Sequence, residues 1–223
     1  MQEKTLQKAW FAGYISFLLC STLYFLNTFL WIPIPFESRV YSISLLSLAM
    51  SFSTVVYKSY GMPRLSAKYL QDLLLDSNAQ YSLLCVVLSF QAESFVALIP
   101  LYIYSIYHVL GFIGSKAPFV TQIFSLQPQL LSIAARFEIY ALFHLLWVWL
   151  CGRGSLLTII VYLQFLRFQY IVSAKTRIAF QQFRMQLDQL TGHPKCPGIV
   201  RNIYDSVKGL VGKLAIEKEE KQK

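Results

Sequence analysis

Four long runs of apolar residues, separated by shorter polar segments, occupy most of the first 170 positions of the chain. A helix needs about 20 residues to cross the hydrocarbon core of a bilayer. The pattern therefore predicts an all-α integral membrane protein with about four hydrophobic regions, each a span or a short hairpin. We expect the first run to be retained as a span, because it is longer than the apolar part of a signal peptide. The runs are 9–32, 40–57, 81–114 and 137–166.

The fourth run contains "CGRGSLL" (151–157) near its middle, and the third is interrupted by "QAES" (91–94). As one helix, the fourth run would be about 45 Å long against a core of about 30 Å. A charged arginine near the midplane would cost roughly 2.5–3.5 kcal/mol. We therefore expect two shorter helices, 137–151 and 156–166. A hairpin break would join them at Gly152, Arg153, Gly154 and Ser155.

The alternative for this run is a single tilted helix whose arginine pairs with Glu93 or Glu138. In the hairpin interpretation neither helix spans a bilayer comfortably, which implies a shallow hairpin or a thinned membrane. Two further segments have a surface pattern. Alternating leucines and charges over 58–80 predict an amphipathic helix, and 115–136 is typical of an interfacial connector.

Beyond the fourth run the chain is basic and amphipathic. A helical pattern over 173–190 is followed by the breakers of "TGHPKCPG", and a second pattern begins at Ile199. We predict a multi-span membrane domain over 1–170 and a cytosolic basic amphipathic-helix tail over 171–223.

The apolar positions of this last segment recur at helical spacing and face away from its basic side chains. The bilayer is a few residues away, so we expect the segment to bind anionic headgroups and to fold at curved surfaces. Packing on another protein helix remains open. The predicted membrane-binding residues are Ile199, Val200, Ile203, Val207, Leu210, Val211, Leu214, Arg201, Lys208 and Lys213.

Composition and charge agree with this class. The chain has 56% hydrophobic and 14% charged residues and a net charge of +9. Most basic residues lie before position 9, between 58 and 68, or after 166. The positive-inside rule then places the N- and C-termini in the cytosol. No aromatic stacking platform or nucleic-acid motif accompanies the basic tail, so we predict no nucleic-acid partner.

Four ionisable residues inside the apolar runs are candidates for chemistry: Glu93, His108, Glu138 and His144. Their spacing does not match a helical metal site, and no hydrolase or phosphate-binding motif is present. We expect them to lie near breaks or segment ends, where headgroups solvate them, and to have structural roles. The cysteines are far apart, and "GHPKC" supplies too few ligands for zinc. The sequence indicates no enzyme, no cofactor and no metal.

The segment "GRGSLLTIIVYLQFLRFQY" resembles the signature of the transmembrane protein 33 family, which includes fungal pore-membrane nucleoporins and Krüppel homologue 2. Arg153 replaces an uncharged residue of an animal member of this family, so its charge is not expected to be required and the two glycines are the better candidates for the break. The residues that carry the resemblance are Gly152, Gly154, Ser155, Leu156, Leu157, Tyr162, Phe165, Leu166 and Tyr170, with Glu138, Ile139 and Tyr140, Cys196 and Pro197, and Asp76 and Ser77 outside the signature.

The resemblance implies a multi-pass protein of the endoplasmic reticulum membrane and nuclear envelope without enzymatic activity. It also implies reticulon-type proteins and nuclear pore components as partners, with effects on the balance of tubules and sheets and on pore organisation. The short hairpins and the amphipathic tail agree with this, because such elements sense or stabilise membrane curvature. Our leading hypothesis is a non-enzymatic membrane-organising protein. The alternative is a membrane adaptor that regulates an endoplasmic reticulum stress sensor or channel through helix contacts at Glu93 and Glu138.

Overall fold

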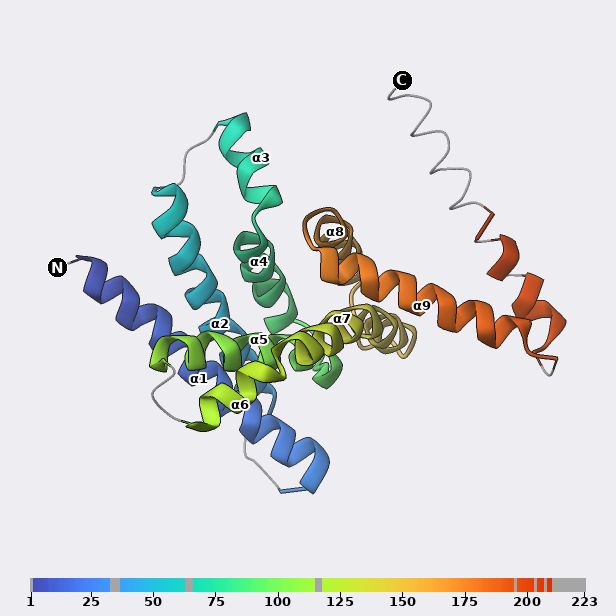
Figure 1. The fold of residues 1–223 in the computed structure, drawn as a ribbon, viewed down its shortest axis with the longest axis horizontal. Coiled ribbons are helices and arrows are strands. Elements are labelled where there is room, and N and C mark those ends of the chain that lie inside the picture. The colour runs from blue at the N-terminus through green and yellow to red at the C-terminus, as the bar shows by residue number, and fades with distance from the viewer. Residues whose placement is uncertain are drawn as a thin grey trace. The chain divides into compact units, whose positions relative to one another are not determined.

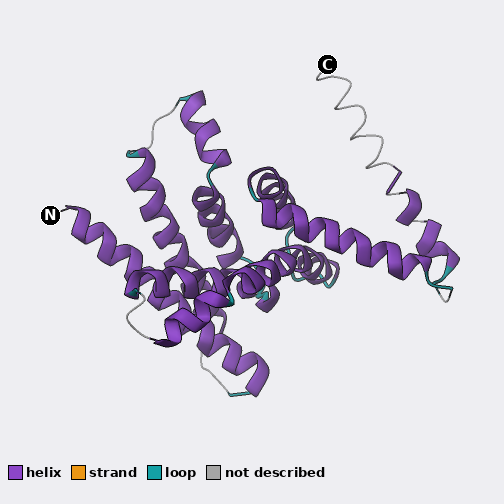
Figure 2. Ribbon diagram, in the orientation of Figure 1, coloured by secondary structure: helices purple, strands orange, loops and turns teal. Residues whose placement is uncertain are grey.

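The computed structural model describes residues 2–32, 37–62, 66–114, 118–194, 196–202, 204–206 and 208–209. These residues form helices joined by short connections, and none of them is in a strand (Figure 2). Contacts divide the chain into two compact units, Met1–Ala179 and Phe180–Lys223. The helices are α1 (Gln2–Leu30), α2 (Glu37–Tyr60), α3 (Ala67–Leu75), α4 (Ser77–Ser89), α5 (Phe95–Ile113), α6 (Pro118–Ser125), α7 (Gln127–Leu150), α8 (Leu156–Val172) and α9 (Ala174–Gly192).

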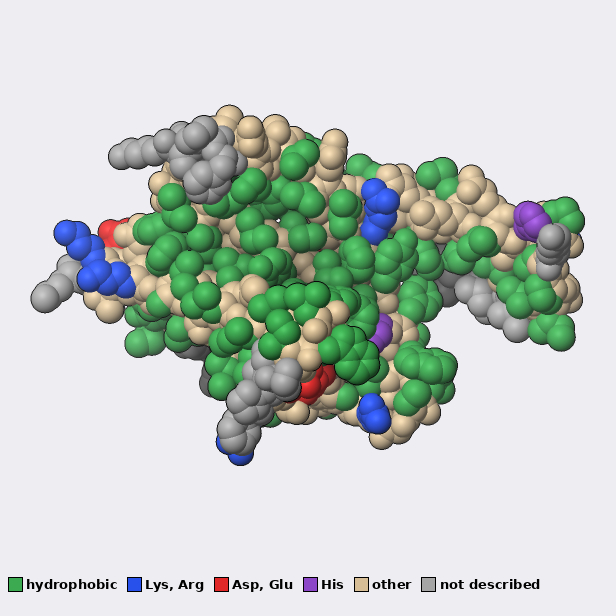
Figure 3. Space-filling model, turned by 90° about the horizontal axis from the view of Figure 1, so that it is seen from below, with side chains coloured by type: hydrophobic (Ala, Val, Ile, Leu, Met, Phe, Trp, Pro, Cys, Tyr) green, Lys and Arg blue, Asp and Glu red, His purple; other side chains and the backbone are tan. Residues whose placement is uncertain are grey.

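Four of these helices are long and apolar enough to cross a membrane: α1, α2, α5 and α7. α8 and α9 make a fifth if that pair, which is bent by 111°, forms one broken span. Large apolar side chains are exposed along α1, α2, α4, α7 and α8. Figure 3 shows hydrophobic side chains over much of the face in view. An exposed surface of this kind is suited to lipid, which confirms an all-α integral membrane protein.

Small residues bring α1 and α2 together along most of their length (Figure 1). Gly13 of α1 faces Ser47 and Ser51 of α2, and a Cβ added to this glycine would lie 2.6 Å from the Ser47 carbonyl oxygen. The Ser51 hydroxyl donates to the Trp10 carbonyl oxygen at 2.8 Å. Helices in lipid associate through such close packing and interhelical hydrogen bonds. The serines of the second apolar run therefore serve the α1–α2 contact.

The segment 58–80 is not one amphipathic helix, as the sequence pattern suggested. α2 continues to Tyr60, α3 is a separate exposed helix, and the chain changes direction at Asp76 before α4. Asp76 ends α3 and caps α4, accepting a hydrogen bond from the Ala79 amide at 2.9 Å. The Tyr60 hydroxyl donates to the same carboxylate at 3.3 Å. This capping interrupts the helix and places the start of α4 beside the end of α2.

The third apolar run folds back on itself. α4 ends at Ser89 and α5 begins at Phe95, with the Ser94 hydroxyl accepting from the Ala97 amide at 3.3 Å as its cap. Asn78, near the start of α4, and Phe112, near the end of α5, line the same cavity. The two helices are therefore the limbs of a hairpin.

The fourth run is longer than predicted at its start. α7 begins at Gln127 and ends at Leu150, so the expected helix start at 137 and the expected connector through 136 are wrong. Pro128 lies in the first turn, where its missing N–H is tolerated, and the leucines and alanines that follow favour a helix. With 24 residues, α7 spans a bilayer without help from α8. A thinned membrane is therefore not needed at α7.

Candidate functional site

The turn between α7 and α8 is built by the glycines of "CGRGSLL". Gly152 has φ 74°, a left-handed conformation that costs other residues about 1 kcal/mol. At Gly154 an added Cβ would lie 3.0 Å from the Trp149 backbone nitrogen. The Ser155 hydroxyl accepts from the Leu157 amide at 3.2 Å and caps α8. Each residue thus has a local role in the turn, whereas the Arg153 side chain is exposed.

Glu138 lies inside the helical bundle and not near a segment end, which corrects the sequence expectation. Its exposed fraction is 1%, and its Oε1 accepts hydrogen bonds from the Tyr81 hydroxyl at 2.5 Å and the Tyr104 hydroxyl at 3.0 Å. The Tyr162 hydroxyl donates to the Glu138 carbonyl oxygen at 2.9 Å. We call Tyr81, Tyr104, Glu138 and Tyr162 the Glu138 cluster. It joins α4, α5, α7 and α8 through buried polar groups.

The Glu138 cluster links two parts of the family resemblance, because Glu138 and Tyr162 belong to separate motifs. Sequence reasoning missed Tyr81 and Tyr104, although both are tyrosines within an apolar run. A buried tyrosine hydroxyl needs a partner, which is the signal that could have found them. Because Glu138 is enclosed, it cannot contact a partner protein unless the bundle opens. This removes one of the two observations that motivated the adaptor hypothesis.

A second pair of polar side chains joins α4 and α8. The Gln169 side-chain amide donates to the Gln80 side-chain carbonyl at 3.1 Å, and Gln80 donates to the Leu74 carbonyl oxygen at 2.6 Å. Both glutamines are buried. Gln80 lies in the first turns of α4 and Gln169 near the end of α8. The end of α8 therefore lies beside the start of α4, at the same end of unit Met1–Ala179 as the α1 N-terminus.

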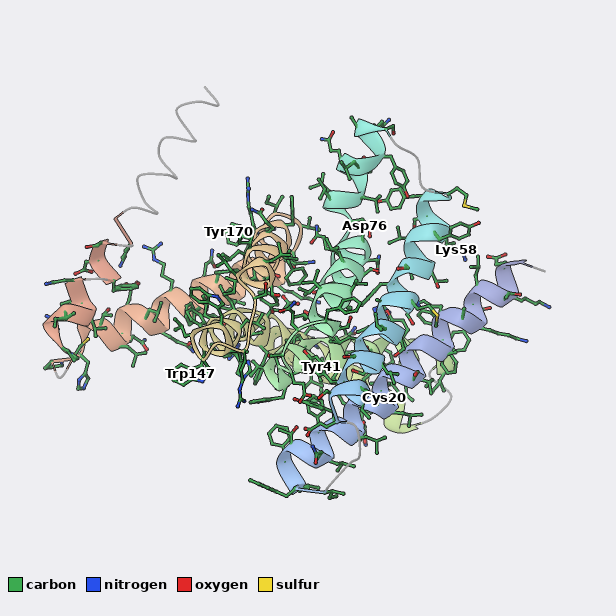
Figure 4. The ribbon with its side chains drawn as sticks, turned by 180° about the vertical axis from the view of Figure 1, so that it is seen from behind. Cys20, Tyr41, Lys58, Asp76, Trp147 and Tyr170 are labelled. Carbon is green, nitrogen blue, oxygen red and sulfur yellow. The ribbon has the colours of Figure 1, made fainter. Side chains whose placement is uncertain are left out.

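Two cavities mark the two ends of this unit. The first, of about 630 Å³, is lined by Glu3, Lys58, Asn78 and Phe112. The second, of about 560 Å³, is lined by late α1, early α2, the α4–α5 connection and the end of α7 with its turn, and Glu93, His144 and Arg153 face it. Figure 4 shows Lys58 and Asp76 toward one end of the unit and Tyr41 toward the other.

The two histidines of the apolar runs, His108 and His144, have structural neighbours. His108 stacks on Tyr14 with ring centroids 5.0 Å apart, and His144 Nδ1 is 2.9 Å from the Ser94 hydroxyl. The tilted-helix alternative required an ion pair between Arg153 and Glu93 or Glu138. These described residues form no such ion pair. Within the described ranges, no group of three or more histidine, cysteine, aspartate or glutamate side chains could hold a metal ion.

The second unit contains the end of α9 and helical turns between 198 and 209. Asp188 accepts hydrogen bonds from the Tyr204 hydroxyl at 2.7 Å and Lys208 Nζ at 2.5 Å. Arg201 Nε donates to the Thr191 carbonyl oxygen at 3.0 Å. We call these three interactions the tail contacts. They turn the polar side of the last described helix toward the end of α9.

The tail contacts shift the ionisation of the groups involved. The hydrogen bond from Lys208, followed by that from Tyr204, lowers the pKa of the Asp188 carboxyl below its usual value. The hydrogen bond to Asp188 raises the pKa of Tyr204 and that of Lys208. These directions mean that the tail contacts favour the ionised form of Asp188 and the protonated forms of Tyr204 and Lys208.

Two of the predicted membrane-binding side chains are exposed in this unit: Ile199 by 75% and Val200 by 50%. Two predicted cations, Arg201 and Lys208, take part in the tail contacts. The remaining predicted positions lie outside the described residues; they are Ile203, Val207, Leu210, Val211, Lys213 and Leu214.

Comparison with known proteins places the whole membrane region in one family. The family model of Transmembrane protein 33/Nucleoporin POM33 matches residues 1–217. A Transmembrane protein 33 homolog of Dictyostelium discoideum is 24% identical, over 92% of this chain and 71% of its own length. Nucleoporin POM33 of Chaetomium thermophilum is 27% identical, over 92% and 84%. No solved structure matches. The chain therefore belongs to the Transmembrane protein 33/Nucleoporin POM33 family.

Proposed function

We propose that the protein is a non-enzymatic organiser of the endoplasmic reticulum membrane and nuclear envelope, and that its C-terminal tail senses membrane curvature. The observation that carries the proposal is the exposure of Ile199 and Val200 beside tail contacts made by polar side chains. An amphipathic helix that uses its polar side within the protein presents its apolar side to the surroundings. In a membrane protein the nearest apolar surroundings are lipid.

Helix geometry supports this division of faces. At about 100° per residue, the tail-contact residues Arg201, Tyr204 and Lys208 lie within about 60° of one another around the helix axis. The predicted apolar stripe, which begins at Ile199, is centred about 110° away from the middle of this set. The side that meets α9 is therefore not the side predicted to enter lipid. Docking of the apolar stripe on α9 is correspondingly disfavoured.

The distribution of charge supports one orientation of the bundle in the membrane. The start of α1, the end of α2, the start of α4 and the end of α8 lie at one end of unit Met1–Ala179, where Lys4 and Lys58 line the cavity. Arg39 and Arg153 are the basic residues next to the connections at the other end. Because basic loops stay on the cytosolic side, we propose that both termini are cytosolic. The basic tail would then face the anionic cytosolic leaflet.

The partners in this proposal are lipid, nuclear pore components and reticulon-type proteins. Pore components are supported by the names of two relatives, Nucleoporin POM33 of Chaetomium thermophilum and Pore membrane protein of 33 kDa of Saccharomyces cerevisiae. Reticulon-type proteins are supported by the family resemblance. An organiser of tubules and pores needs to recognise curved membrane, which the exposed stripe would supply.

The test is sorting of the full chain between flat and curved membrane. Fluorescent protein is reconstituted into giant anionic vesicles, and its density is compared on the vesicle and on narrow tubes drawn from it. We expect enrichment on the tubes, reduced by the double substitution Ile199→Ser and Val200→Ser. Met185→Ser, which removes another exposed apolar side chain of the same unit, is the matched control. Equal density of the unaltered protein on tube and vesicle would refute the proposal that the tail senses curvature.

A further inference from the structure

The cavity of about 560 Å³ carries two opposite charges that the protein does not neutralise. Glu93 comes from the α4–α5 connection and Arg153 from the α7–α8 turn. Among the described residues, neither side chain has an ion-pair or hydrogen-bond partner. A partly buried carboxylate without a partner is unfavourable, and a bound ligand would relieve that cost. The cavity volume lies within the range of about 300–1,000 Å³ found for small-molecule sites.

The two opposite charges of the cavity favour a ligand that carries both signs of charge. An anion would be attracted by Arg153 but repelled by Glu93. A cation would be attracted by Glu93 but repelled by Arg153. A zwitterion satisfies both, with a phosphate on the guanidinium and an ammonium on the carboxylate. Tyr24 and Trp147 also line the cavity, and aromatic faces attract ammonium groups. The residues that line the cavity therefore offer Arg153 to a phosphate, and Glu93 with the two aromatic rings to an ammonium group.

The surroundings of the cavity indicate a lipid. Trp147 lines it and is 66% exposed, and Leu150 at the end of α7 is 71% exposed. Tryptophan side chains with such exposure are typical of the membrane–water interface. The connection between α4 and α5 is non-helical at Gln91, Ala92 and Glu93, and these residues line the cavity, where polar surroundings can solvate irregular backbone. Acyl chains could lie against the apolar end of α7 while the headgroup occupies the cavity.

We propose that this cavity binds the headgroup of a zwitterionic glycerophospholipid, with Arg153 on the phosphate and Glu93 on the ammonium. The proposal rests on unit Met1–Ala179 alone and does not depend on the tail. It gives Arg153 a role that the turn itself does not require.

The test measures retained lipid by native mass spectrometry of the purified full chain. Short-chain phosphatidylcholine and phosphatidylglycerol are the two lipid probes, and glycerophosphocholine is the free headgroup without acyl chains. We expect one phosphatidylcholine per chain, retained in preference to phosphatidylglycerol. Arg153→Gln should weaken retention about tenfold or more, the effect of losing a charged hydrogen bond. Glu93→Gln should shift the preference toward phosphatidylglycerol, because the remaining charge is positive.

Glu37→Gln and Arg167→Gln are the matched controls, since Glu37 at the start of α2 and the exposed Arg167 of α8 do not line the cavity. Both should retain phosphatidylcholine like the unaltered protein, and all variants should have the same thermal unfolding midpoint. Equal retention of the two lipids by the unaltered protein would overturn the proposal. Binding of glycerophosphocholine as tight as that of the lipid would also overturn it, because the ligand would then be a soluble zwitterion and not a lipid.

Discussion

The Tyr81 hydroxyl donates a hydrogen bond of 2.5 Å to the Glu138 carboxylate across the bundle, so that the first limb of one hairpin is joined to the first limb of the next. Tyr104 donates to the same oxygen at 3.0 Å. A carboxylate with two hydroxyl donors, enclosed among apolar helices, is a specific connection between α4, α5 and α7. Its removal should affect the stability of the bundle more than that of any single helix.

Substitution of Glu138 by leucine should therefore destabilise the protein. Two buried hydroxyls lose their acceptor, and interhelical hydrogen bonds in membranes contribute about 0.6 kcal/mol on average and up to about 1.7 each. We expect a loss of roughly 1–3 kcal/mol, measured as a lower thermal unfolding midpoint in detergent. Glu138→Gln keeps an acceptor oxygen and should cost less. An equal effect of the two substitutions would show that charge, and not hydrogen bonding, is what the bundle requires.

Gly13 should tolerate no side chain. A Cβ there would lie 2.6 Å from the Ser47 carbonyl oxygen, and backbone cannot move aside as a flexible side chain can. Gly13→Ala should separate α1 from α2 and lower the unfolding midpoint by several degrees. Adding Ser51→Ala should not restore it, because the carbonyl contact remains. Gly111→Ala is the matched control: this helical glycine has nothing within 4 Å of an added Cβ, so alanine there should be neutral or stabilising.

The two glycines of the turn between α7 and α8 are needed for different reasons: Gly152 for its positive φ, and Gly154 for its close approach to the Trp149 backbone. Gly152→Ala should cost about 1 kcal/mol because of the positive φ, and Gly152→Asn should cost less, since asparagine tolerates that conformation better. Gly154→Ala and Gly154→Asn should both be harmful, because any Cβ there meets the Trp149 backbone at 3.0–3.1 Å. Unfolding midpoints of the four variants test this pattern. Equal costs of alanine and asparagine at position 152 would contradict the role of φ.

The sequence predicted the helical class and the four apolar regions well because apolar run length is a direct consequence of bilayer thickness. It predicted less well where a helix boundary depends on local capping. Asp76 divides 58–80 by accepting a hydrogen bond from the Ala79 amide. The segment 127–136 joins α7 because its leucines and alanines favour a helix, although only Ala134 and Ala135 are buried there. Neither event changes hydropathy enough to be seen in the pattern.

The location of Glu138 was missed for a different reason. A lone carboxylate in an apolar run has the same pattern whether headgroups or tyrosines solvate it. Its partners are 57 and 34 positions away in the sequence, so that only the folded bundle brings them together. The cavity that contains Glu93 and Arg153 is formed in the same way, by connections that are distant in sequence.

The tail contacts should be lost when Asp188 is neutralised. Asp188→Asn removes the charged acceptor of Tyr204 and Lys208, so the last described helix should separate from α9 and become more sensitive to protease. We expect faster trypsin cleavage after Arg201 and Lys208 in the full chain at neutral pH. Asp205→Asn, on the same helix but outside the tail contacts, should cleave like the unaltered protein.

Acid should have the same effect as Asp188→Asn. The pKa of Asp188 is lowered in the folded protein, so its contribution to stability is present above the usual carboxyl pKa and disappears as the pH falls through the lowered value. Pepsin cleavage beside Tyr204, compared between the unaltered protein and Asp188→Asn, should differ at about pH 5 and converge as the pH falls below the usual carboxyl pKa of about 4. A difference that stays constant over this range would mean that the Asp188 charge does not hold the helix, because only an ionised carboxylate can form the ion pair with Lys208.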